Sequence, residues 1–264
     1  MEHEGAIRLS VFLGLFVLLA AFEAFAPRRA RRQKQSTRWM TNWGMTLLNT
    51  VALRLMALAL PLLAVGAALD AQTQGWGVLN WTDWPVWIEV ALAVIVLDFS
   101  IWLQHLITHK VPLLWRLHRV HHADVDIDVT TAIRFHPVEI ALSMLLKIGL
   151  VYLLGPAAIA VVLFEILLNG TAMFNHANLR LPERVDAVLR TVLVTPDMHR
   201  VHHSVNRSEH DSNYGFALSI WDRMFGTYIA QPAKGHEAMD IGLEWQDDRP
   251  STLPWSLGLP FQRK

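Results

Sequence analysis

The chain has 264 residues, of which 53% are hydrophobic and only 17% are charged, and its formal net charge is zero. Soluble domains carry about 25% charged residues, so this composition favours a membrane protein, and the balanced charge gives no support for a nucleic-acid partner. The chain has no cysteine, which excludes disulfides, thiolate-bound haem and cysteine-ligated iron–sulfur clusters. Any metal must therefore be held by histidine and carboxylate side chains.

Four apolar stretches predict an all-α integral membrane bundle of about four to five helices, since a span needs roughly 20 apolar residues. The stretches cover residues 7–25, 45–69, 84–103 and 138–168. The chain starts with MEHEG, which has acids where a cleaved signal would have Lys or Arg, so we expect the first helix to be retained. Gly155-Pro156 interrupts the fourth stretch and predicts a hairpin of two helices there.

The loops between these stretches differ in charge. Residues 27–38 contain Arg28, Arg29, Arg31, Arg32, Lys34 and Arg38, whereas residues 70–83 contain no Lys or Arg. The positive-inside rule therefore places the first loop in the cytoplasm and the second loop outside, with the N-terminus outside. The alternative for the basic run is a patch that binds nucleic acid or lipid headgroups. In the topological interpretation, the third helix returns to the cytoplasm at about residue 105.

Histidines gather in three short motifs, all on the side that this topology makes cytoplasmic. One motif is H-x-x-x-H, and the pentapeptide HRVHH occurs twice; the histidines are His105, His109, His118, His121, His122, His199, His202 and His203. Helical positions i, i+3 and i+4 share one face, so each motif can present several imidazoles to a metal. Three rings of a helical H-x-x-H-H do not easily reach one ion. The motifs therefore predict two ions that share the ligands, in a histidine-rich helical cap, with His176 of FNHAN as a ninth candidate.

The type of ligand alone does not decide which metal is bound. Zinc sites are usually four-coordinate, and eight or nine imidazoles on two ions imply higher coordination numbers. Imidazole suits iron, copper, zinc and nickel alike.

The motifs resemble those of the fatty acid hydroxylase / sterol desaturase superfamily over about residues 90–230. RFHPVE at 134–139, FNHAN at 174–178 and NYGFALSIWDRMFGTY at 213–228 also match. The resemblance implies a membrane-bound, non-haem di-iron oxygenase that uses O2 and two electrons to hydroxylate or desaturate a C–H bond of a lipid. It implies that the eight motif histidines are iron ligands and that His176 is a further ligand. His136 precedes Pro137, so we interpret RFHPVE mainly as a structural junction near the site.

The resemblance also implies an external electron donor, a ferredoxin or a small cytochrome, that docks on the cytoplasmic side. We expect one membrane domain over residues 1–264, with the catalytic part at about 95–230 and an irregular tail at 231–264. A bacterial inner membrane is the expected location. The lipid, the oxidised carbon and the oligomeric state stay open, and hydroxylation is favoured over desaturation.

Three polar side chains are candidates for supporting the ligands. Asp98 lies inside an apolar helix, where a carboxylate indicates function by default. It could accept the free N–H of a ligating histidine, or it could pair with Arg54 or make another interhelical contact. Asp222 could act like Asp98 from the C-terminal part, and Asn178, like Asn175, could orient His176 or hold water.

Other segments carry weaker signals. Asp124, Asp126 and Asp128 form D-x-D-x-D, but Val129 and Phe135 replace the Gly and Glu of a calcium-binding loop. The pair His210-Asp211 is expected in a solvated loop. Residues 179–194 have apolar residues at helical spacing and predict an amphipathic helix at the membrane interface.

Two other classes of protein use similar ligands. A di-zinc membrane hydrolase would activate water without O2 or reductant. A histidine-rich metal-binding or transport protein would need ionisable residues along its spans, and apart from Arg54, Asp98 and Lys147 the apolar stretches have few.

Overall fold

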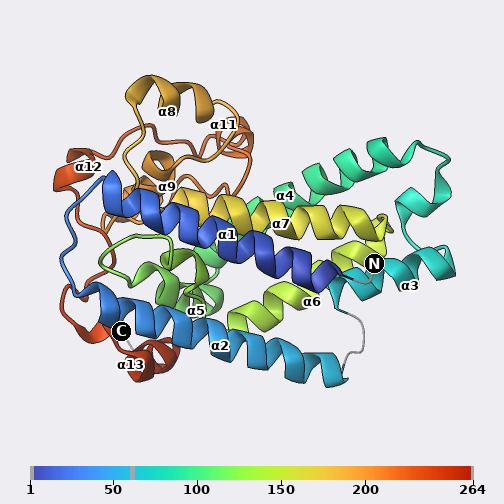
Figure 1. Cartoon of the computed structure of the whole chain (residues 1–264), viewed down its shortest axis with the longest axis horizontal. Helices are drawn as coiled ribbons and strands as arrows, with labels where there is room; N and C mark the ends of the chain where they lie inside the picture. The colour runs from blue at the N-terminus through green and yellow to red at the C-terminus, as the bar shows by residue number, and fades with distance from the viewer. Residues whose placement is uncertain (1–2, 60–62, 263–264) are drawn as a thin grey trace.

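A computed structural model describes residues 3–59 and 63–262, and the regular structure of these residues is helical (Figure 1). The longer helices are α1 (Glu4–Phe25), α2 (Gln35–Ala59), α3 (Ala64–Gln74), α4 (Val86–Lys110), α5 (Pro112–His122), α6 (Pro137–Leu154) and α7 (Ala158–His176). The shorter helices are α8 (Glu183–Leu189), α9 (Pro196–His202), α10 (Arg207–His210), α11 (Ile220–Met224), α12 (Gly235–Ala238) and α13 (Leu253–Gly258). Turns of 3-10 helix lie at Val78–Trp81, Thr131–Ile133, Arg249–Ser251 and Leu259–Phe261. The predicted all-α class is confirmed.

Four of these helices are long and apolar enough to cross a membrane: α1, α4, α6 and α7. Their outward faces keep large apolar side chains exposed, among them Val17, Leu153 and Leu167. Burying such surface away from water is favourable, so a bilayer around these helices accounts for faces that no other part of the described chain covers.

The predicted hairpin is confirmed, with α6 ending at Leu154 and α7 beginning at Ala158. Gly155 closes α6 with a positive φ of 61°. A Cβ at this position would lie 2.3 Å from the carbonyl oxygen of Trp76. Only glycine combines this backbone conformation with so close an approach.

The second predicted span is wrong as a single helix. The helix that contains Met45 ends at Ala59 and α3 begins at Ala64, with residues 60–62 outside the described ranges. At its other end α2 begins at Gln35, ten residues before the predicted stretch, because the helix includes polar residues that a search for apolar stretches does not find. Their side chains have buried partners: Asn42 Nδ2 donates to Thr130 Oγ1 at 2.8 Å, and Thr41 Oγ1 donates to the carbonyl of Ser251 at 2.5 Å.

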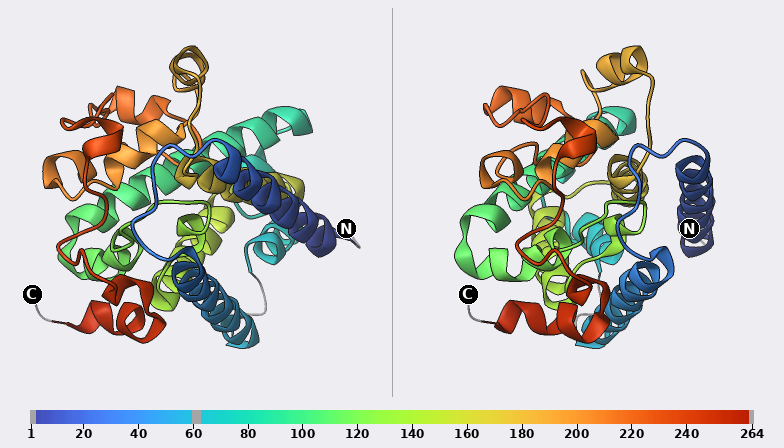
Figure 2. Two further views of the ribbon diagram at one scale, coloured as in Figure 1. Left: turned by 60° about the vertical axis from the view of Figure 1, so that its left-hand side comes forward. Right: turned by 90° about the vertical axis from the view of Figure 1, so that its left-hand side faces the viewer.

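The long helices run side by side, and the shorter helices gather at one end as a cap (Figures 1 and 2). Helix α7 packs against α1 and α4, while α2 packs against α6. The cap contains α5, α8, α9 and α11, and α3 lies at the opposite end of the molecule. This arrangement confirms a helical bundle with a histidine-bearing cap.

The basic run and the acidic triplet together fasten the cap to the bundle. Arg38 is fully buried and pairs with Asp124 at 2.7 Å and Asp128 at 2.6 Å. Asp126 accepts hydrogen bonds from the backbone N–H groups of Arg32 and Gln33. The triplet therefore anchors the start of α2.

Two expectations for the C-terminal half need correction. Only Glu183–Leu189 is helical within residues 179–194, because Pro182 sets the start and the chain turns at Arg190. The tail after residue 230 is not irregular throughout, since it forms α12 and α13. It also packs on α5, where the guanidinium of Arg119 donates to the carbonyl of Leu259 at 2.5 Å.

Candidate metal centre

Four elements deliver the histidines to one place. His105 and His109 lie at the end of α4, and Pro112 starts α5 directly after a break at Val111. Because the chain reverses there, the first HRVHH motif packs against H-x-x-x-H, with the ring centroids of His109 and His122 4.8 Å apart. His176 closes α7, and α9 supplies the second HRVHH motif.

The nine histidines form two groups. The first group has five members, His105, His109, His118, His122 and His202, and the second has four, His121, His176, His199 and His203. Within each group the candidate ligand atoms all lie within 4.8 Å of one another, and every member is buried. The structure thus brings together all nine predicted ligands, and neither group includes His136.

The repeated pentapeptide serves both groups at once. In the first copy, His118 and His122 are four residues apart and join the first group, while His121 points to the second. In the second copy, His199 and His203 join the second group, and His202 points to the first. A helical H-x-x-H-H therefore bridges two sites, as its i, i+3, i+4 spacing predicts.

Most rings are oriented by a partner on Nδ1. Four Nδ1 atoms lie at hydrogen-bond distance from backbone carbonyls: His105 from Tyr214 at 2.8 Å, His121 from Arg134 at 3.3 Å, His176 from Ala172 at 2.7 Å and His202 from Ser212 at 2.6 Å. A ring that donates from Nδ1 leaves Nε2 unprotonated. The held Nδ1 atoms therefore fix the tautomer in which Nε2 can bind a metal.

Several other ring nitrogens make no hydrogen bond to any described residue and so remain available to a metal. Among the described residues, both nitrogens of His109, His122 and His203 are buried without a hydrogen-bond partner. Buried polar atoms without partners are costly, so the arrangement is consistent with ions between the rings. Burial and the neighbouring imidazoles hold the pKa of His122 and His203 well below its usual value, which keeps these rings neutral.

Glu139 is a residue that sequence reasoning missed. Its carboxylate lies 2.6 Å from Nδ1 of His118. It belongs to RFHPVE, where His136 caps α6 by accepting the N–H of Val138 at 3.2 Å and Pro137 begins the helix. The motif is a structural junction, as expected, but the junction also places an acid in the first turn of α6 beside His118. The motif RFHPVE marked this segment as important in the sequence. It did not show that the partner of Glu139 is His118.

Asp222 organises the chain beside His105 without touching an imidazole. Its carboxylate accepts hydrogen bonds from Trp102 Nε1 at 3.0 Å and from the backbone N–H groups of Tyr214 and Gly215, both at 2.8 Å. The carbonyl of the same Tyr214 receives Nδ1 of His105. Asp222 is therefore placed to position His105 through the backbone.

The other two supporting candidates have structural partners. Asp98 accepts from Trp221 Nε1 at 2.8 Å and the N–H of Leu218 at 3.3 Å, so it makes the contact between elements that was one of its expected roles. Asn178 binds both backbone polar groups of Arg29 and does not orient His176 through its side-chain contacts.

His210 is buried, contrary to the expectation of a solvated loop. It lies at the end of α10, and its Nδ1 is 3.1 Å from the carbonyl of Ser204. Its ring stacks on Trp115 at 5.4 Å, and Trp115 also contacts His109 and His122. The pair closes one side of the first histidine group, a packing role that local sequence does not reveal.

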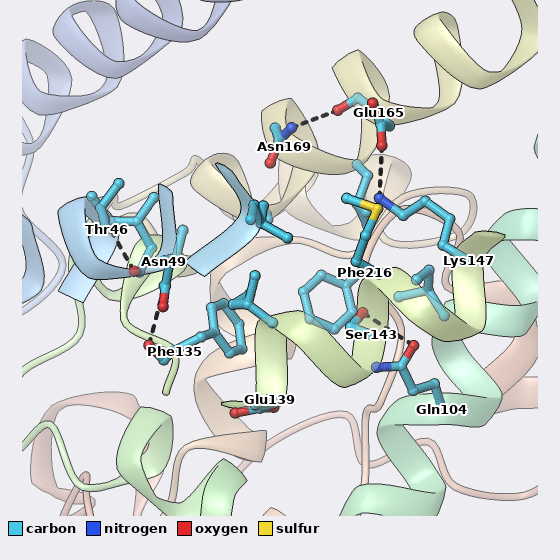
Figure 3. Close-up of a pocket in the computed structure, with 18 of the residues that line it drawn as sticks. Thr46, Asn49, Gln104, Phe135, Glu139, Ser143, Lys147, Glu165, Asn169 and Phe216 are labelled. Atoms are coloured by element: carbon cyan, nitrogen blue, oxygen red, sulfur yellow. Dashed lines mark hydrogen bonds and ion pairs between the residues drawn. The ribbon is translucent and has the colours of Figure 1, made fainter. Parts of the chain in front are cut away.

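A cavity of about 390 Å³ reaches the first histidine group from between the long helices (Figure 3). His105, His118 and Glu139 line one end, with Phe135 and Phe216 beside them. The cavity continues among α1, α2, α4, α6 and α7. The first histidine group therefore borders a space that opens within the apolar bundle.

Apolar helices that end in two buried groups of histidines define a membrane protein with two groups of side chains that could hold metal ions. The fatty acid hydroxylase family model matches residues 90–227, a stretch that includes all nine histidines and more than half of the chain. The chain belongs to the fatty acid hydroxylase family.

Individual relatives agree with this family. An ornithine lipid hydroxylase of Rhizobium tropici is 27% identical over 256 residues, which cover 96% of this chain and 75% of that protein. Alkylglycerol monooxygenases of Xenopus tropicalis and Homo sapiens are 32% and 31% identical, over 58% and 59% of this chain. The chain spans only about a third of the length of these monooxygenases. No solved structure matches. The family, the relatives and the four apolar helices identify an integral membrane protein and support an oxidoreductase.

Proposed function

We propose that this protein is a membrane-bound di-iron oxygenase that hydroxylates a C–H bond of a lipid, using O2 and two electrons. One observation carries the proposal: two adjoining groups of five and four buried imidazoles lie at the end of the apolar bundle, and the five-histidine group borders a cavity there through His105 and His118. The hydroxylases and monooxygenases among the relatives support the reaction type. No finding supports the alternatives of a zinc hydrolase or a metal transporter.

The five-histidine group would hold one iron and the four-histidine group the other. Two zinc ions with four ligands each would use eight nitrogen donors, and the two groups offer nine. Imidazole is also a suitable ligand for iron. Bound iron would activate O2 for the oxidation of an unreactive C–H bond. The proposed ligands are His105, His109, His118, His121, His122, His176, His199, His202 and His203.

The protein's own part is to position the lipid and to exclude water. Phe135 stacks on the ring of His121 at 4.4 Å, and the ring of Phe216 lies 5.1 Å from that of His105. These aromatic walls favour a hydrocarbon segment beside the histidines and keep water away from the reacting carbon. Glu139 holds the Nδ1 proton of His118 and so keeps its Nε2 directed at the centre.

The electrons would come from a separate donor, a ferredoxin or a small cytochrome, on the cytoplasmic side. The basic run lies at the same end of the bundle as the histidines, because Arg38 pairs with Asp124 and Arg28 pairs with Asp197 in the first turn of α9. The positive-inside rule then supports a cytoplasmic centre with the N-terminus outside. A bacterial inner membrane is the proposed location.

Lipid analysis under isotopically labelled O2 tests the proposed reaction. Cells that express the wild type should accumulate a lipid with one labelled oxygen atom, and cells that express His203→Ala at equal protein level should not. An oxygenated product whose oxygen comes from water, or equal product with both variants, would contradict the proposal.

A further inference from the structure

Three charged side chains line the cavity at the end opposite the histidines. Lys147 Nζ lies 2.8 Å from Glu165 Oε1, and an Arg8 guanidinium nitrogen lies 2.5 Å from Glu165 Oε2 (Figure 3 shows the first pair). The side chain of Glu165 is 5% exposed and that of Lys147 is 12% exposed. The charges come from α1, α6 and α7, three helices that are apolar enough to cross a membrane.

Such a cluster is expensive inside a membrane bundle. Taking charges out of water costs several kcal/mol per ion, and well-packed apolar residues often replace a buried ion pair without loss of stability. Ionisable residues within membrane helices therefore mark binding or transport paths more often than structural contacts. Neither Lys147 nor Glu165 contacts the histidine groups, so the proposed oxidation chemistry does not account for them.

One polar stripe connects this cluster with the histidines. Glu139, Ser143 and Lys147 follow at intervals of four residues and share one face of α6, which lines the cavity. Ser143 Oγ donates to Gln104 Oε1 at 3.3 Å on the opposite helix. Eight residues of helix separate Glu139 from Lys147, a rise of about 12 Å.

The rest of the cavity wall is mainly apolar. Phe12 and Leu53 come from α1 and α2, and Met144 and Leu168 from α6 and α7. Pockets of roughly 300–1,000 Å³ with apolar walls and a few placed polar groups are typical small-molecule sites. A ligand that fits has an apolar body and a polar end.

Lys147 determines what kind of polar end fits. An ammonium group has three N–H donors and no acceptor, and within the described residues the hydrogen-bond partner of Lys147 is Glu165. Donors therefore remain for the cavity, where Asn169 already gives its amide N–H to the carbonyl of Glu165. The complementary group is an oxygen acceptor.

We propose that the cavity binds a single-chain amphiphile by its polar end, with a carboxylate or hydroxyl oxygen on Lys147 and the hydrocarbon chain leading to His105 and His118. The proposal rests on the proposed function for what happens at the histidines. It deepens that function, because the oxidised carbon would then lie at a fixed distance from the polar end, set by the two turns of α6 between Glu139 and Lys147.

Thermal unfolding of the purified protein in a maltoside detergent tests the binding. A ligand that binds the native state raises the unfolding midpoint. Palmitate, 1-hexadecanol and hexadecane share one chain length, and the first two separate a charged end from a neutral one. In the wild type, at least one of the two polar-ended probes should raise the midpoint more than hexadecane does, and equal shifts with all three would overturn the proposal without any variant.

Lys147→Met keeps the length of the stem and removes the donors, so it should weaken binding of the favoured polar probe about tenfold or more, while Lys147→Arg should retain it. Lys234→Met is the matched control, because Lys234 forms an ion pair with Asp240 on the exposed surface. An unchanged preference in Lys147→Met would also overturn the proposal. Metal content measured in the same samples distinguishes the amphiphile site from the proposed function. Lys147→Met should keep its metal. A wild type that binds the polar probe but contains no iron would contradict only the proposed function.

Discussion

Individual side chains around the histidines decide whether nine imidazoles can act as ligands. Backbone carbonyls orient His105, His121, His176 and His202, whereas His118 depends on the carboxylate of Glu139. A substitution can remove a side chain but not a backbone carbonyl. Glu139 is therefore the partner of a histidine ring that mutation can test most directly. Asp222 acts one step further away, through the backbone of Tyr214.

Substitution of Glu139 should weaken metal binding. Outer partners of ligating histidines are worth about 10–100-fold in metal affinity, so Glu139→Ala should lose metal at the upper end of this range. Glu139→Gln keeps an acceptor oxygen and should lose less. Metal retained after dialysis against a chelator measures the effect, with the exposed Glu183→Gln as control. Full retention in Glu139→Ala would show that His118 needs no such partner.

Asp222→Asn should destabilise the fold around His105. The carboxylate accepts at least four hydrogen bonds, from Trp102, Tyr214, Gly215 and Thr227. An amide replaces one acceptor oxygen by a donor, and a buried donor left unpaired costs about 1–3 kcal/mol. The midpoint of unfolding should fall by a corresponding amount. A variant as stable as the wild type would show that the 213–216 segment is held by other contacts.

At the scale of helices, the sequence predicted the elements whose signals are local. The Gly155-Pro156 break, the break between α4 and α5, and the one-face placement of each histidine motif follow from proline, glycine and helical spacing. The start of the second helix was misplaced because the polar start of α2 is compensated by a distant segment, with Arg38 paired to Asp124 and Asp128. The spacing predicted that each HRVHH motif serves two sites, but which histidine joins which group depends on how α5 and α9 pack.

Gly149 within α6 and Gly155 directly after it give a matched test of the hairpin. Gly155→Ala should destabilise the protein, because a left-handed backbone costs an L-residue about 1–2 kcal/mol and the new Cβ would meet the carbonyl of Trp76. Gly149→Ala lies inside α6 with nothing within 4 Å of its new Cβ, and it should stabilise by up to about 1 kcal/mol. Thermal unfolding compares the two. Equal effects would mean that the turn at Gly155 does not constrain the hairpin.

At the scale of the whole molecule, the apolar helices and the histidine groups adjoin each other. The apolar helices hold a cavity that ends at the histidines, and the basic run fastens the same end of the bundle. Composition and the histidine motifs were enough to predict the class of protein. Glu139 and the Arg8–Glu165–Lys147 cluster were not predictable, because their partners lie on other helices.

Metal analysis of the protein purified without oxygen tests the central claim most directly. The wild type should contain about two irons per chain, and His121→Ala, which removes one ligand of the four-histidine group, should contain clearly less. Stoichiometric zinc after expression in iron-replete cells, with no iron bound on reconstitution, would contradict a di-iron oxygenase.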